Sequence, residues 1–92
     1  MSGAKQIQFK PGTVVATIGA TKVASKEQII ALVKRHLSGD WGDVDAEDAK
    51  ANEHAVKWGE RMLSSYKIGD EKLWAITESD RSSTTVLTPG EY

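Results

Sequence analysis

The fold is decided by the stretch Gly39-Asp40-Trp41-Gly42-Asp43-Val44-Asp45-Ala46-Glu47-Asp48, which lies between two predicted helices. Glycine adopts backbone angles closed to other residues, so we expect a sharp turn here, with Trp41 folded inward as a large apolar anchor. Helix initiation is the simplest role for the acids, with Asp45 at the N-cap and Glu47 and Asp48 in the first turn. A cation site or an acidic docking face is the alternative.

The helix before this stretch begins at Ser25, because Ser25-Lys26-Glu27-Gln28 has the form of a capping box. Gly39 is the expected C-terminal cap. His36 lies beside the apolar stripe near the helix end, where the helix dipole favours a partial positive charge, and we interpret it as structural. The stripe itself consists of Ile29, Ile30, Val33 and Leu37.

The second predicted helix runs from Ala46 to Trp58 and ends at Gly59. Its spacing places Ala51, Ala55 and Trp58 on one face, with Trp58 filling the far end of the core. His54 lies on the flank of that face. Since His36 and His54 belong to different helices, a two-histidine metal site would need a tertiary coincidence, and we predict no metal and no cofactor.

Strand patterns flank the two helices. The segment Gln6–Lys10 alternates around Ile7 and Phe9 and stops at Pro11-Gly12, and Thr13–Ile18 is β-branched; a short helical turn at Ala20–Ala24 is an alternative for this region. After the second helix the pattern alternates again, and short links predict an antiparallel meander. Its strands are Met62–Ile68, Lys72–Glu78 and Thr84–Thr88.

Together these elements predict a two-layer α+β domain, an antiparallel three- to four-stranded sheet packed against two helices. Residues 1–92 form a single domain, with residues 1–5 expected to be disordered. Trp41, Trp58 and Trp74 come from a loop, a helix and a strand, and we expect all three to converge on one core. The pattern does not decide the edge at which the N-terminal strand joins the sheet.

Composition excludes several classes of function. Twelve basic and thirteen acidic residues give a net charge of −1, so no global field attracts nucleic acid or an acidic membrane. There is no cysteine, which excludes disulfides and thiolate chemistry and fits a reducing cytoplasm, the expected location. The longest strongly apolar run is too short to cross a bilayer. We therefore expect no membrane association and no nucleic-acid partner.

Several motifs carry a resemblance to a known family: Gly39-Asp40-Trp41-Gly42-Asp43, then Ala51-Asn52, Leu63-Ser64-Ser65-Tyr66, and the run from Leu73-Trp74-Ala75-Ile76-Thr77-Glu78 to Leu87. From about Pro11 to Tyr92 the chain resembles a family of small bacterial proteins whose members are uncharacterised, some labelled plasmid-related protein or restriction-modification subunit. The resemblance implies a bacterial, cytoplasmic protein from mobile or accessory DNA and no established activity. A methyltransferase subunit is excluded by the chain length and by the lack of a Gly-rich cofactor loop.

Two segments are candidate binding sites. The first is the acidic loop, with Asp40, Trp41 and Asp43; its spacing does not match the EF-hand calcium loop. The second is the link between the last two strands, with Asp80, Arg81 and Ser82. The simplest interpretation of the link is a turn in which Asp80 and the serines bond to backbone amides while Arg81 pairs with an acid. A binding loop is the next interpretation.

These features favour a non-enzymatic protein-interaction module that uses the acidic loop or the link. The alternative is a small hydrolase or ligand-binding protein that uses the segment Glu78–Ser83 with a histidine. A deep pocket joining His36 or His54 to this segment would favour the enzyme, whereas an exposed Trp41 would favour an interface. Open sheet edges would allow two copies to pair, so both a monomer and a dimer are possible.

Overall fold

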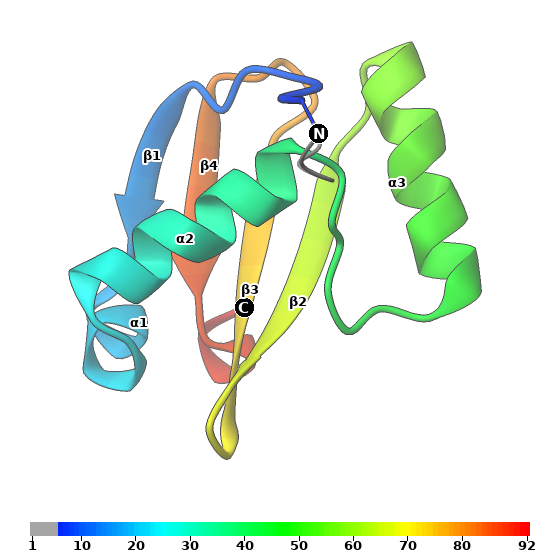
Figure 1. Cartoon of the computed structure of the whole chain (residues 1–92). Helices are drawn as coiled ribbons and strands as arrows, with labels where there is room; N and C mark the ends of the chain where they lie inside the picture. Colours follow the sequence, from blue (N-terminus) through cyan, green and yellow to red (C-terminus); the bar gives the residue numbers. More distant parts are fainter. Residues whose placement is uncertain (1–5) are drawn as a thin grey trace.

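A computed structural model describes residues 6–92, and the segment 1–5, expected from the sequence to be disordered, lies outside the described residues. One mixed sheet carries helices on one of its faces (Figure 1). The α+β fold class is thereby confirmed. The elements in chain order are β1 (Thr13–Ala16), α1 (Ile18–Val23), α2 (Lys26–Leu37), α3 (Ala46–Trp58), β2 (Met62–Ile68), β3 (Glu71–Thr77), β4 (Ser83–Leu87) and a 3-10 turn, η1 (Pro89–Glu91).

Local chemistry accounts for the ends of both long helices. At the start of α2 the Ser25 hydroxyl accepts from the Gln28 amide while the Gln28 side chain accepts from the Ser25 amide, as the capping box predicts. The Asp45 side chain caps α3 in the same manner by accepting from the Asp48 amide. Gly59 ends α3 with a left-handed φ of 74°, which a residue with a side chain adopts only under strain.

The sheet order is β1-β4-β3-β2. Strands β2, β3 and β4 form the predicted antiparallel meander, with Ser64 opposite Ala75 and Ala75 opposite Val86. The expectation of a wholly antiparallel sheet is wrong, because β1 pairs with β4 in parallel. A hairpin link forces antiparallel pairing, but β1 is separated from β4 by three helices and two strands, so its direction is not constrained in this way.

The predicted boundaries near the N-terminus need correction. The segment 6–10 is not a strand: its backbone makes one bond, from the Gln8 amide to the Leu37 carbonyl, and it lies across the end of α2. The strand predicted to reach Ile18 ends at Ala16, because the Thr17 side chain accepts from the Ala20 amide and starts α1 there. The alternative of a helical turn in this region is therefore confirmed, as a third helix.

The core lies between the sheet and the helices and contains Trp41, but the predicted convergence of three tryptophans is wrong. Trp58 is 64% exposed, because α3 presents Asn52 and Ala55 to β2 and leaves Ala51 in solvent. Trp74 is half-buried on the opposite face of the sheet, where its ring meets that of Tyr92 at 5.6 Å.

The apolar stripe of α2 also differs from the prediction at one position. Ile30 is 45% exposed, whereas Leu32 and His36 are buried with Ile29, Val33 and Leu37. The stripe is thus rotated toward His36, which makes a histidine part of the packed face. None of the helices in residues 6–92 is long and apolar enough to cross a membrane.

Candidate functional site

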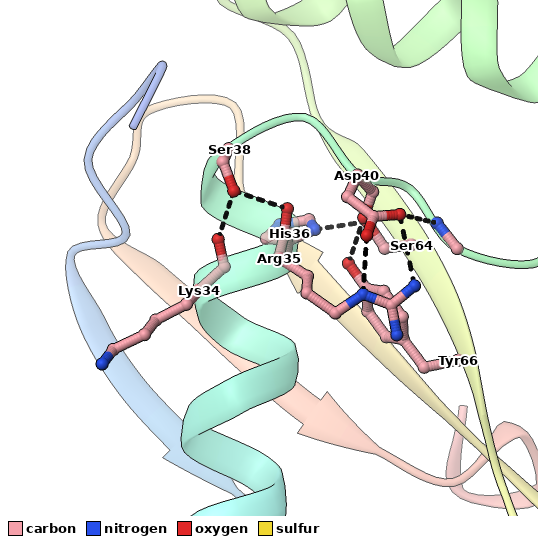
Figure 2. A network of polar contacts seen from close by, with 8 residues as sticks. Lys34, Arg35, His36, Ser38, Asp40, Ser64 and Tyr66 are labelled. Atoms are coloured by element: carbon pink, nitrogen blue, oxygen red, sulfur yellow. Dashed lines mark hydrogen bonds and ion pairs between the residues drawn. The ribbon is translucent and has the colours of Figure 1, made fainter. Parts of the chain in front are cut away.

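The acidic loop after α2 is held by side chains of the helix and of β2 (Figure 2). The Asp40 carboxylate accepts from Arg35 at 2.7 and 3.3 Å, while its backbone carbonyl accepts from the Tyr66 hydroxyl at 2.7 Å. The Arg35 guanidinium lies 4.7 Å from the centre of the Tyr66 ring. The bond to Asp40 raises the pKa of Arg35, and burial raises the pKa of Tyr66. Both side chains therefore keep their ordinary protonation at neutral pH.

Trp41 and Asp43 also have internal partners. Trp41 is only 5% exposed; its indole N–H donates to Glu53 at 2.8 Å and its ring stacks on Phe9. Asp43 lies 3.2 Å from the ammonium of Lys72 in an exposed ion pair. Trp41 is therefore buried, as the two flanking glycines allow, and it does not form the exposed tryptophan that would favour an interface at this loop.

The same loop closes one edge of the sheet, which we call the β2 edge. The Ser65 amide donates to the Trp41 carbonyl at 3.1 Å, and the Asp43 amide donates to the Ser65 carbonyl, so Gly42 lies beside β2 as a short parallel bridge. Toward the start of β2, the Asn52 side-chain amide donates to the Leu63 carbonyl at 2.8 Å and accepts from the Leu63 amide at 3.1 Å. The outward backbone groups of Leu63 and Ser65 are therefore satisfied.

The second predicted segment, the link between β3 and β4, forms the expected turn. The Asp80 carboxylate accepts from the Ser82 amide at 2.9 Å, and its bonds to Ser82 lower the pKa of Asp80. Arg81 has a left-handed φ of 60°. Its guanidinium does not pair with an acid as predicted but donates to backbone carbonyls, two of which lie at the end of α3. These acceptors are Ala55, Glu60, Glu78 and Ser79.

Phe9 connects the two predicted segments. The Arg81 guanidinium lies 5.7 Å from the centre of the Phe9 ring, and that ring stacks on Trp41 with 6.2 Å between centroids. Arg81 and Trp41 thus meet at one end of the molecule through a buried aromatic ring. The sequence pattern did not reveal this role of Phe9, because the alternation around it predicted a strand.

Beneath α2, a chain of buried polar bonds crosses the sheet. His36 is fully buried; its Nδ1 lies 2.5 Å from the Ser64 hydroxyl on β2, and its Nε2 lies 2.8 Å from Thr77 on β3. The Thr77 hydroxyl bonds to Thr84 on β4 at 2.7 Å, and Thr84 donates to the Pro11 carbonyl at 2.8 Å. We call this chain the His36 network. It links β2 to the residues just before β1.

Burial lowers the pKa of His36 to about 4, so the ring is neutral at physiological pH. Desolvation thus outweighs the helix dipole, which favours a partial positive charge at this end of α2. His36 bonds to Thr77, which directly precedes the segment Glu78–Ser83, but makes no hydrogen bond to the segment itself, and His54 pairs instead with Glu60 at 3.0 Å. Within residues 6–92, no three histidine or acidic side chains gather in a way that suits a metal ion.

The other edge of the sheet, the β1 edge, is open. The Thr13 and Thr17 amides donate to carbonyls of Ser82 and Val86, so the alternate residues Val14 and Ala16 direct their backbone groups away from β4. No other segment within residues 6–92 pairs with that side of β1. Val14 is 47% exposed. The β1 edge therefore presents unpaired backbone donors and acceptors beside an apolar side chain.

An apolar hollow of about 400 Å³ adjoins this edge, between the end of β1, α1 and the first turns of α2. We call the β1 edge and this hollow the β1 groove. The sequence predicted a strand over Thr13–Ile18, which includes β1. The hollow itself had no sequence signal, because it depends on helix α1, which the sequence offered only as an alternative. The hollow is lined by Ala16, Thr21, Ala24, Ser25, Lys26, Ile29 and Ile30.

Comparison of the chain with protein-family models, with curated proteins and with solved structures finds no match in any of the three. The resemblance to small bacterial proteins, with the cytoplasmic location and the mobile-DNA origin that it implies, stays a prediction. Function is therefore inferred from the geometry of the described residues.

Proposed function

We propose that this protein is an interaction domain that binds an extended segment of a partner protein as an added strand at the β1 edge. The observation that carries the proposal is the difference between the two edges of one sheet. The β2 edge is closed by backbone and side-chain bonds to Leu63 and Ser65, whereas no segment within residues 6–92 pairs with the outward side of β1, to which Val14 and Ala16 direct their backbone groups. An unpaired strand edge is a template for another chain.

The surroundings of β1 support the same function. In strand addition the main-chain bonds supply affinity, and pockets for alternate side chains supply specificity. The hollow lies on the α2 side of β1, the side to which Val14 and Ala16 also point through their pairing with Thr84 and Val86. A partner strand beside β1 would direct every second side chain toward this hollow.

The acidic loop and the link, which the sequence predicted as interaction surfaces, are not the binding site in this proposal. Asp40, Trp41 and Asp43 hold the β2 edge, and Arg81 holds the end of α3. These contacts give each residue a function in folding that does not require a partner. The hydrolase alternative gains no observation in its favour, because the histidine that meets a serine is fully buried and bonds to Ser64 on β2, not to a serine of the segment Glu78–Ser83.

Selection from a library of displayed random dodecapeptides tests the proposal. We expect selected peptides to slow hydrogen exchange at the Val14 and Ala16 amides, because these would donate to the added strand. Val14→Pro removes one outward N–H without removing a bond to β4, and it should weaken peptide binding at least tenfold. Melting temperature of the variant verifies that the fold is retained.

Lys67→Pro is the matched control, because Lys67 continues the outward alternation of Leu63 and Ser65 on β2. Its substitution removes an outward N–H at the other edge and should leave peptide affinity unchanged. Selected peptides that protect amides elsewhere and bind Val14→Pro normally would refute the proposal. A selection that yields no binder would also count against it.

A further inference from the structure

We infer that the segment bound in the β1 groove is acidic: it carries an apolar side chain for the hollow and, on the same face of the strand, an Asp or Glu directed at Lys22 and Lys26. This inference rests on the proposed function and adds the chemistry of the partner.

The first observation is the separation of charge along the fold. Residues 6–37, which form β1, α1 and α2, carry five basic side chains against the single acid Glu27, a net charge of +4 with His36 neutral. Residues 38–60, which form the acidic loop and α3, carry seven acids against two lysines, a net charge of −5. In Figure 1 β1 and α3 lie at opposite sides of the sheet, so the open edge is on the basic side.

The second observation concerns the rim of the hollow. Lys26 lines the hollow, and Lys22 is exposed in the last turn of the neighbouring helix α1. Neither lysine has an acidic partner among residues 6–92, and in this they resemble Lys50 and Lys57 on α3 but differ from Lys72, which pairs with Asp43. Two unpaired cations beside an apolar hollow complement a carboxylate better than a neutral or basic side chain.

Two acids in this part of the fold, Glu27 and Glu91, form no ion pair with Lys22 or Lys26. The Glu91 carboxylate reaches the junction of β1 and α1, where it accepts from Thr17, Gly19 and Thr88; these bonds lower its pKa to about 2 and keep it charged. Glu27 lies next to Lys26 along the helix, and adjacent helical residues do not face each other. Both ammonium groups are therefore available to a carboxylate of a partner.

Strand geometry then sets the order of residues in the partner. Side chains on one face of a strand are two residues apart, about 7 Å along the chain. An apolar residue in the hollow would place the residue two positions before or after it near the rim. We therefore expect the pattern acid-x-apolar or apolar-x-acid, where x is a residue that faces the other side of the sheet.

A second copy of this chain is the competing occupant. Antiparallel pairing of two β1 strands about Val15 would satisfy the outward groups of Val14 and Ala16 in both copies. It would also bring the basic sides of the two copies together, including both Lys22 and Lys26 pairs, without an acid between them. Like charges in juxtaposition oppose such a dimer, so charge favours a distinct acidic segment.

Parallel selections with the displayed dodecapeptide library test the inference, one on the wild-type protein and one on the Lys22→Glu/Lys26→Glu variant. Wild-type protein should enrich Asp or Glu two positions from an apolar residue, and the variant should enrich Lys or Arg at that position instead. The wild-type consensus peptide should lose at least tenfold in affinity for the variant, and its binding to wild-type protein should weaken as NaCl is added. Lys50→Glu/Lys57→Glu, on α3, is the control and should change neither result.

The outcomes separate the two proposals. Peptides that protect Val14 and Ala16 but show no acidic preference would overturn the inference and leave the proposed function standing. A failure to obtain any strand-adding peptide would remove both. If the peptide-free protein forms a dimer in sedimentation experiments, with Val14 and Ala16 protected, the occupant is a second copy and the inference is wrong.

Discussion

The two edges of the sheet differ in whether their outward backbone N–H and C=O groups are hydrogen-bonded. At the β2 edge, the loop through Gly42 bonds to Ser65, and the Asn52 side chain occupies the place of a peptide group opposite Leu63. At the β1 edge nothing within residues 6–92 has that function. Exposed strand edges promote association, so proteins commonly protect them. A sheet with one protected edge directs association to the other, and substitutions made at one edge at a time test this difference.

The largest effect is expected from Gly42→Ala at the protected edge. Gly42 has φ of 72°, and a Cβ atom there would collide with the Ser65 carbonyl oxygen and the Tyr66 ring. The backbone strain and the clash together should lower the free energy of unfolding by about 3 kcal/mol. Urea denaturation measures this loss.

Gly59→Ala is the control for that substitution. Gly59 has a similar φ of 74° but open space around its Cα, so it tests the strain without the clash. We expect a loss of about 1 kcal/mol. Equal losses for the two variants would mean that the close approach of the loop to β2 contributes nothing to stability.

The next effect concerns the His36 network, which joins the two edges beneath α2. His36 has a pKa of about 4 in the folded protein against about 6.5 unfolded, so the unfolded chain binds more protons between these values. Stability is then full above pH 6.5 and is lost as the pH falls toward 4. The loss between about pH 7 and about pH 5 should be about 2 kcal/mol, measured by urea denaturation at each pH.

His36→Asn tests the assignment of this pH dependence to the network. The variant should be less stable at neutral pH, because the bonds to Ser64 and Thr77 are lost, but its stability should change little over the same pH range. The Glu91 carboxylate, with a pKa of about 2, remains charged in the folded protein over this range. An unchanged pH slope in His36→Asn would assign the effect to another group.

The elements that form the protected edge were easier to predict from the sequence than those of the open edge. Capping residues fixed α2 and α3 because Ser25, Asp45 and Gly59 act on backbone groups within one turn. Short links likewise identified the meander. The motifs also marked Gly39–Asp43 and Asn52, but no pattern could assign them to closing β2, since that depends on contacts between residues distant in the chain.

The open edge and the core partners were harder to predict. A hollow formed by β1, α1 and α2 has no local sequence pattern, and α1 was only an alternative. Helical spacing placed Trp58 in the core, yet α3 meets the sheet through Asn52 and Ala55. The polar Asn52 is what defines the buried face of α3, and an apolar periodicity does not detect a polar residue that pairs with a strand.

Asn52→Ala should have a smaller effect at the protected edge. The substitution leaves the Leu63 N–H and C=O without partners, at a cost of about 1.5 kcal/mol in the free energy of unfolding. Alanine is the better helix former, so helix propensity would act in the opposite direction. Faster hydrogen exchange at the Leu63 amide is the specific measurement. Lys50→Ala, at an exposed position of the same helix, should leave that exchange rate unchanged.

The smallest effect is expected at the open edge, from Val14→Thr. Val14 is half-exposed and its backbone groups bond to nothing within residues 6–92, so a β-branched polar substitute should change stability by less than about 0.5 kcal/mol. Leu63→Thr, at the corresponding outward position of β2, removes apolar contact from a half-buried site and should cost about 1 kcal/mol. In wild-type protein the Val14 amide should exchange at least a hundredfold faster than the Leu63 amide. Slow exchange at Val14 in dilute protein without peptide would show that the β1 edge is already covered, and the contrast between the two edges would then be lost.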